Sequence, residues 1–122
     1  MIGYVTLGSN DIPRAAAFYD ALLGTLGAKR IMDFGDFIVW SVSPRLPGLS
    51  VTKPYDGKAA SVGNGVMVAL VMDSKDKVDA LYHKAIELGA HCEGKPGARS
   101  DNFYAAYFRD PDGNKLNAFC MS

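Results

Sequence analysis

The sequence has no excess of charge of either sign and no long apolar run. Lys plus Arg and Asp plus Glu each total 13 among 122 residues, so the formal net charge is zero. That balance argues against a nucleic-acid or anionic-membrane partner, and also against an acidic site for a cationic ligand. The longest apolar run, Val66 to Met72, is far shorter than the roughly 20 residues that span a bilayer. We therefore expect neither nucleic acid nor membrane as a partner.

Cysteine and histidine are scarce, with two residues of each. Cys92 and Cys120 form no C-x-x-C motif, and we expect them to be reduced, buried thiols rather than a disulfide. His83 and His91 have no partner at ligand spacing, which is typical of surface or hydrogen-bonded histidines. The first eleven residues contain no charged segment followed by an apolar stretch, so the sequence predicts no secretory signal and a cytoplasmic location.

The remaining composition favours one folded domain, because 48% apolar content in 122 residues can bury a core. Alternation, helical spacing and turn residues predict two series of elements. The first is a strand at 4–7, a helix at 13–26 and strands at 29–32, 37–42 and 49–52. After a connection at 53–65, the second is a strand at 66–72, a helix at 75–88 and strands at 91–93, 103–109 and 115–120.

The two series match each other in sequence as well as in order. Leu26-Gly27-Ala28 recurs as Leu88-Gly89-Ala90, about half the chain later. This self-similarity predicts a single α+β domain, 1–122, made of two β-α-β-β-β repeats at about 1–56 and 64–122. We expect a curved, mostly antiparallel sheet around a cup, with the helices outside.

Three sequence segments carry a resemblance to a known family. They are the helix start Asn10-Asp11-Ile12 with Phe18-Tyr19, the following Leu23-Gly24, and the late turn Phe108-Arg109-Asp110-Pro111-Asp112-Gly113-Asn114. Together with the repeat, they resemble the vicinal oxygen chelate superfamily, which includes glyoxalases, bleomycin resistance proteins, extradiol dioxygenases and fosfomycin-resistance enzymes. The resemblance implies a homodimer and a site inside the cup.

The resemblance also implies a divalent metal held by His and Glu side chains at the floor of the cup. The corresponding positions in this chain are Tyr4, Met67 and Asn117, with a fourth near Ser50. A phenol, a thioether and a neutral amide are weak ligands for Zn²⁺, Ni²⁺, Mn²⁺ or Fe²⁺. We therefore predict no metal site and no cofactor.

The side chains expected to point into the cup combine aromatic surface with a few polar tips, which is typical of a small-molecule site. The predicted ligand-binding residues are Tyr4, Trp40, Met67, Tyr104, Asn117 and Phe119. Lys53, Arg99 and Arg109 are candidates for an anionic group at the rim, although each is also a typical solvated cation. No catalytic residue is recognisable, so enzymatic activity stays open.

Three functions fit this pattern. The first is a metal-free protein that binds a small, partly aromatic or apolar molecule. The second is a metal-dependent lyase or dioxygenase of the same superfamily with displaced ligands, in which the metal would act as a Lewis acid. The third is a domain whose cup serves association with a partner.

Overall fold

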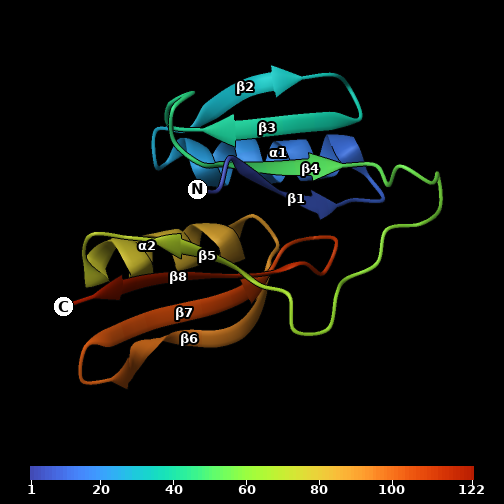
Figure 1. The fold of residues 1–122 in the computed structure, drawn as a ribbon. Helices are drawn as coiled ribbons and strands as arrows, with labels where there is room; N and C mark the ends of the chain where they lie inside the picture. Colours follow the sequence, from blue (N-terminus) through green and yellow to red (C-terminus); the bar gives the residue numbers. More distant parts are fainter. The chain divides into compact units, whose positions relative to one another are not determined.

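The computed structural model describes residues 1–122, which form eight strands and two helices (Figure 1). The first half contains β1 (Tyr4–Gly8), α1 (Ile12–Gly24), β2 (Lys29–Asp33), β3 (Phe37–Ser41) and β4 (Gly48–Thr52). The second half contains β5 (Val68–Val71), α2 (Lys75–Glu87), β6 (His91–Ser100), β7 (Phe103–Arg109) and β8 (Lys115–Met121).

The chain divides into two compact units, Met1–Gly63 and Asn64–Ser122, here called the N-terminal and C-terminal units. Their four-stranded sheets have equivalent orders, β1-β4-β3-β2 and β5-β8-β7-β6. In each sheet the first strand runs parallel to the last, and the other neighbours are antiparallel. The predicted α+β fold with two β-α-β-β-β repeats is confirmed.

The two helices begin with the same kind of side-chain hydrogen bond and are followed by the same glycine conformation. The Asp11 side chain accepts a backbone hydrogen bond of 3.1 Å at the start of α1, and Ser74 accepts one of 3.2 Å at the start of α2. After each helix a glycine adopts a positive φ, 83° at Gly27 and 100° at Gly89, a conformation that glycine reaches without steric cost. The recurring Leu-Gly-Ala segments are therefore equivalent helix ends.

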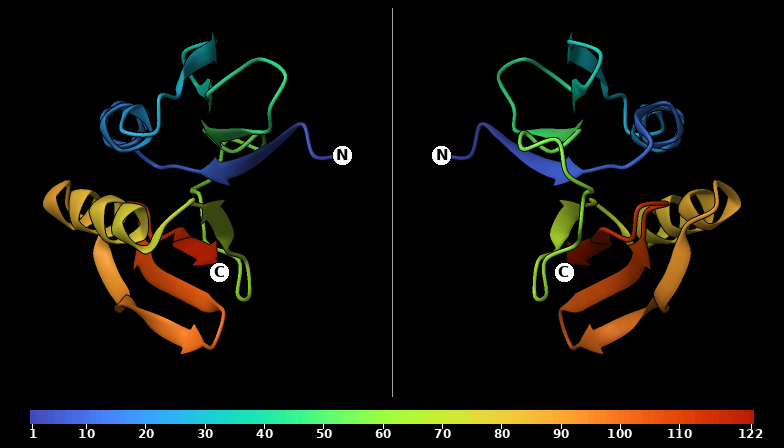
Figure 2. Two further views of the ribbon diagram at one scale, coloured as in Figure 1. Left: turned by 90° about the vertical axis from the view of Figure 1, so that its left-hand side faces the viewer. Right: turned by 90° about the vertical axis from the view of Figure 1, so that its right-hand side faces the viewer.

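Each helix packs on one face of its own sheet (Figure 2). Its apolar residues are buried against that face. Fully burying a large apolar side chain contributes about 1.5–3 kcal/mol. Fully buried apolar side chains of helices and strands include Tyr19, Leu22, Trp40 and Val51 in the N-terminal unit and Val78, Leu81, Phe108 and Leu116 in the C-terminal unit. No helix is long and apolar enough to cross a membrane.

Two expectations about the C-terminal unit were wrong. Strand β6 extends from His91 to Ser100, well beyond the predicted 91–93, because three shifts of register let Gly94, Pro96 and Gly97 follow the edge of the sheet. Both cysteines are free, but Cys92 is exposed at the start of this edge strand and only Cys120 is buried. The Cys92 thiol lies against Tyr82 and raises the pKa of that phenol.

Candidate functional site

The turn between β7 and β8 fixes which side chains share a face of the C-terminal sheet. Asp110 is buried, and its carboxylate accepts hydrogen bonds of 2.9 Å from the backbone of Asp112 and Asn114 and of 3.0 Å from the Asn114 amide. The turn sets Arg109 opposite Lys115 and hence Tyr107 opposite Asn117. A slip of one residue would move Asn117 to the helix side, so the turn that Asp110 stabilises matters for the position of Asn117.

We call the sheet surface opposite each helix the distal face. In the C-terminal unit its central rows are Ala69 with Asn117 and Tyr107, and Val71 with Phe119 and Ala105. Phe119 stacks on Phe103 with a centroid separation of 5.4 Å. The neighbouring rows, such as Leu70 with Ala118 and Ala106, lie on the helix side. The predicted orientation of Asn117 and Phe119 away from α2 agrees with this register.

Asn117 is the unusual residue of this face. Its side chain is 1% exposed, yet its Oδ1 atom has no hydrogen-bond partner. Leaving a buried polar atom unpaired costs about 1–3 kcal/mol, so such atoms are rare in folded proteins. Ala69, its neighbour on β5, has no polar side-chain atom to offer. The amide oxygen is therefore available to a donor that the chain itself does not supply.

The distal face of the N-terminal unit is aromatic at one end and polar at its centre. Tyr4 is 52% exposed and meets Phe37 edge-on at 5.8 Å, and Phe37 stacks on Phe34 at 6.4 Å. Ser50 is fully buried and donates to the Thr6 hydroxyl at 2.7 Å and to the Val5 carbonyl at 3.2 Å. Tyr4 thus presents an aromatic surface, whereas Ser50 already has its partners.

Trp40 and Tyr104 lie on the helix side of their sheets, and their predicted orientation was wrong. The Trp40 indole is buried and donates 2.8 Å to Asp20 on α1. The Tyr104 hydroxyl donates 2.7 Å to Asp79 on α2, beside a cavity of about 20 Å³ that holds no more than a water molecule. In both cases a polar tip finds its partner on the helix, which fixes the ring there.

The residues at the family's metal positions do not fit a divalent ion. Tyr4, Met67 and Asn117 offer a phenol, a thioether and an amide oxygen, and the Ser50 hydroxyl is engaged. Met67 is 41% exposed just before β5. Nowhere in residues 1–122 do three His, Cys, Asp or Glu side chains gather in a way that could hold a metal.

The three candidate rim cations have different surroundings. Arg109 pairs with Glu93 and donates 2.9 Å to the Gly113 carbonyl, and this pairing lowers the pKa of Glu93. Arg99 lies over the ring of Tyr107 on the distal face of the C-terminal unit. Lys53 belongs to the N-terminal unit and lines a pocket there.

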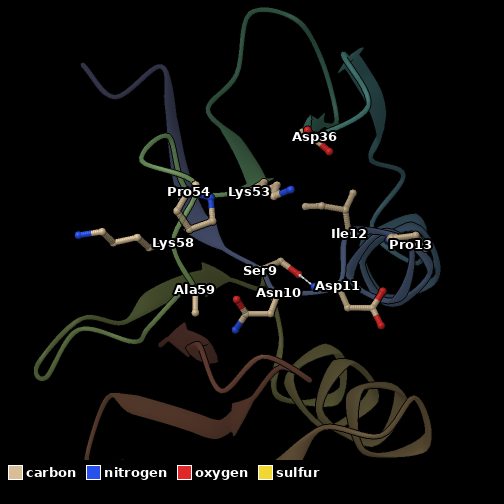
Figure 3. Close-up of a pocket in the computed structure, with 11 residues that line it drawn as sticks. Ser9, Asn10, Asp11, Ile12, Pro13, Asp36, Lys53, Pro54, Lys58 and Ala59 are labelled. Carbon is tan, nitrogen blue, oxygen red and sulfur yellow. Dashed lines mark hydrogen bonds between the residues drawn. The ribbon is translucent and has the colours of Figure 1, made fainter.

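This pocket, of about 440 Å³, was not predicted. Its walls come from residues 9–13 around the start of α1, from the segment after β4, and from Asp36 between β2 and β3. Two hydrogen bonds between Asn10 and the Ala60 backbone, of 3.1 and 2.7 Å, tie that segment down. In Figure 3 the amino group of Lys53 is on the side of Ile12, while Lys58 points away from the other labelled residues. The segment has no periodic pattern, so its sequence gave no signal of a pocket.

The sequence and the fold match known proteins. A family model described as Glyoxalase/Bleomycin resistance protein/Dioxygenase superfamily matches residues 1–118. The chain belongs to this superfamily. A glyoxalase/bleomycin resistance protein from Albidiferax ferrireducens T118 is 37% identical, with a TM-score of 0.90 and coverage of 100% of this chain and 99% of that one.

Two solved structures of lower sequence identity share the fold. The lactoylglutathione lyase from Agrobacterium tumefaciens is 20% identical, with a TM-score of 0.72 and coverage of 98% of this chain and 92% of its own. The fosfomycin resistance protein FosX from Mesorhizobium loti is 15% identical, with a TM-score of 0.71 and coverage of 100% and 92%. A comparison with curated proteins found no match.

Proposed function

We propose that this superfamily member binds a small, partly aromatic or apolar molecule on the distal face of its C-terminal unit, without a metal ion. The unpaired Oδ1 of the buried Asn117 carries the proposal, because a ligand donor would remove the cost of leaving that atom unpaired. The Phe103–Phe119 stack beside it offers apolar surface for the rest of the ligand. The ligand-binding role of Tyr4, in the other unit, stays a prediction.

The alternative is a metal-dependent lyase or dioxygenase reaction. It would require a carboxylate or imidazole set that replaces Tyr4, Met67 and Asn117 at the family's metal positions. The donor chemistry of these residues supports the metal-free proposal instead. Elemental analysis after expression in metal-supplemented medium separates the two, because the alternative requires close to one equivalent of a transition metal per chain.

A thermal-shift screen of metal-free protein against small aromatic and heteroaromatic compounds tests binding, with hits confirmed by native mass spectrometry. We expect hits whose stabilisation is lost in Asn117→Ala and kept in Asn64→Ala, a matched change at an exposed asparagine outside the strands. Hits that are insensitive to Asn117→Ala, or that need an added divalent ion, would contradict the proposal.

We also propose that the chain forms a homodimer, as its superfamily resemblance implies. Strands β1 and β5 are edge strands of their sheets, and the apolar side chains of Val66, just before β5, and Val71, at its end, are exposed. Such edges are templates for pairing with another strand. Light scattering coupled to size-exclusion chromatography should give twice the 13.1 kDa chain mass, and a monomer at all concentrations would contradict this proposal.

A further inference from the structure

Two cations share one aromatic ring on the distal face of the C-terminal unit. The Arg99 guanidinium carbon lies 5.4 Å from the centroid of Tyr107, and Lys115 Nζ lies 5.5 Å from the same centroid. Tyr107 stands directly opposite Asn117 in the β7–β8 register. Side chains opposite each other in an antiparallel pair are neighbours, so the ring that both cations contact lies next to Asn117.

The position of Arg99 depends on two glycines of β6. A Cβ atom on Gly94 would lie 3.3 Å from Arg99 Nη2 and 3.1 Å from Tyr107 Cδ1. A Cβ atom on Gly97 would lie 3.0 Å from Arg99 Nη1. The guanidinium also donates 2.7 Å to the Lys95 carbonyl. The irregular, glycine-containing part of β6 therefore makes room for the guanidinium beside Tyr107.

Neither of these cations has a carboxylate within ion-pair distance, although the charge of Lys115 adds to that of Arg109 in lowering the pKa of Glu93. Arg109 on the same sheet is paired with Glu93, and Arg30, which lies 5.9 Å from the centroid of Trp40, bonds to two carboxylates. Arg99 and Lys115 form no ion pair, although like charges near one ring repel each other. An anion bound beside the ring would reduce this repulsion, and the Arg99 guanidinium has N–H donors beyond the one bonded to the Lys95 carbonyl.

We propose that Arg99 and Lys115, beside Tyr107, bind the carboxylate of a small organic acid. The planar guanidinium can donate two parallel hydrogen bonds to a carboxylate, and the lysine adds a second positive charge. The apolar or aromatic part of the acid then lies toward Asn117 and Phe119. This inference rests on the proposed function and gives the ligand its chemical class.

Isothermal titration calorimetry with sodium benzoate and with neutral benzamide tests the charge preference. We expect benzoate to bind at least about tenfold more tightly, and the difference to disappear in Arg99→Gln and Lys115→Gln. Arg99→Lys should give an intermediate preference for benzoate, because lysine keeps the charge but cannot form two parallel hydrogen bonds to the carboxylate. Lys58→Gln, at an exposed lysine of the N-terminal unit, is the matched control and should leave the affinities for benzoate and benzamide unchanged. Backbone amide shifts at Gly94, Gly97 and Tyr107 in NMR spectra locate the binding.

The possible results separate this inference from the proposed function. Equal binding of benzoate and benzamide, with shifts at Asn117 and no effect of Arg99→Gln, overturns the carboxylate site and leaves the proposed function standing. Sulfate that displaces benzoate at equal affinity also overturns it, since the site would then take any anion. Absence of binding by both probes up to 10 mM, about the weakest affinity useful for a site, overturns the inference while the wider screen still tests the proposed function.

Discussion

Trp40 Nε1 donates a hydrogen bond of 2.8 Å to Asp20 Oδ1, and this contact fixes the only tryptophan of the chain against helix α1. The same carboxylate accepts bonds of 2.9 and 2.6 Å from Arg30, and this lowers the pKa of Asp20. A buried indole N–H thus depends on a carboxylate at the surface of the unit. The contact also explains why Trp40 is unavailable to a ligand on the distal face.

Asp20→Ala should lower the free energy of unfolding by about 1–3 kcal/mol, because the buried indole N–H loses its acceptor. Asp20→Asn keeps an acceptor and should cost less. Asp36→Ala, at an exposed aspartate of the same unit, is the control. Urea unfolding followed by the fluorescence of Trp40 measures all three, and equal midpoints for Asp20→Ala and Asp36→Ala would contradict the role of this contact.

The same pair predicts a pH dependence. Because the pKa of Asp20 is lower in the folded state, its contribution to stability is present above the unfolded value near 3.8 and is lost as pH falls through the folded value. Wild type should therefore lose stability more steeply than Asp20→Asn below about pH 4. If the free energies of unfolding of the two proteins fell in parallel in acid, the pKa of Asp20 would be the same in the folded and unfolded states, and the prediction would be wrong.

A side chain at Gly48 should lower the free energy of unfolding. An added Cβ would lie 2.8 Å from Val39 Cγ1 and 3.1 Å from the Trp40 carbonyl oxygen, and the backbone atom cannot move aside cheaply. Gly48→Ala should cost about 1–3 kcal/mol. Gly24→Ala, where a Cβ meets nothing within 4 Å, should be neutral or stabilising by up to about 1 kcal/mol. Similar urea midpoints for the two variants would contradict the close packing of β3 and β4.

The hydrogen bond between Tyr104 and Asp79 predicts that the protein loses stability at alkaline pH. This hydrogen bond raises the pKa of the phenol, so the contribution is present below the unfolded value of 10 and is lost as pH rises through the folded value. As the pH rises above 10, wild type should lose more stability than Tyr104→Phe. The absorbance of tyrosinate at 295 nm should show one late-titrating phenol fewer in the variant, and an unchanged late phase would contradict the assignment.

Asn117→Leu should separate stability from binding. Leucine has the same branched shape and no polar atom to leave unpaired, so the variant should gain about 1 kcal/mol or remain neutral. The same change should abolish the proposed ligand binding, because the amide is gone. Paired urea unfolding and calorimetry measure both effects. A strongly destabilised variant that still binds ligand would place the amide in a structural role.

The sequence predicted the elements well because helix ends and turns have local signals. Asp11, Gly27 and the turn from Asp110 to Asn114 act where their residue types indicate. The turn also set the face of Asn117 correctly. Strand β6 was underestimated, because glycine and proline in a bulged edge strand have the same composition as a loop.

The candidate site was harder to predict, because alternation along a strand gives two faces and does not say which one the helix covers. Trp40 and Tyr104 were assigned to the distal face, but their partners, Asp20 and Asp79, are distant in sequence. Tyr107, on the face of Asn117, was not among the predicted ligand-binding residues. The alternation between Tyr104 and Tyr107, combined with the register of the hairpin, was the signal that could have identified it.

The Asn117 side-chain amide in metal-free protein gives the most direct test of the central claim. Its paired Nδ2 proton signals in a ¹H–¹⁵N spectrum are assigned by their disappearance in Asn117→Ala, and the protein is then titrated with an aromatic hit in the presence of EDTA. The account predicts a saturable shift of these signals together with the Phe119 backbone amide. Signals that stay unchanged until a divalent metal is added, or shifts confined to the pocket around Lys53, would contradict it.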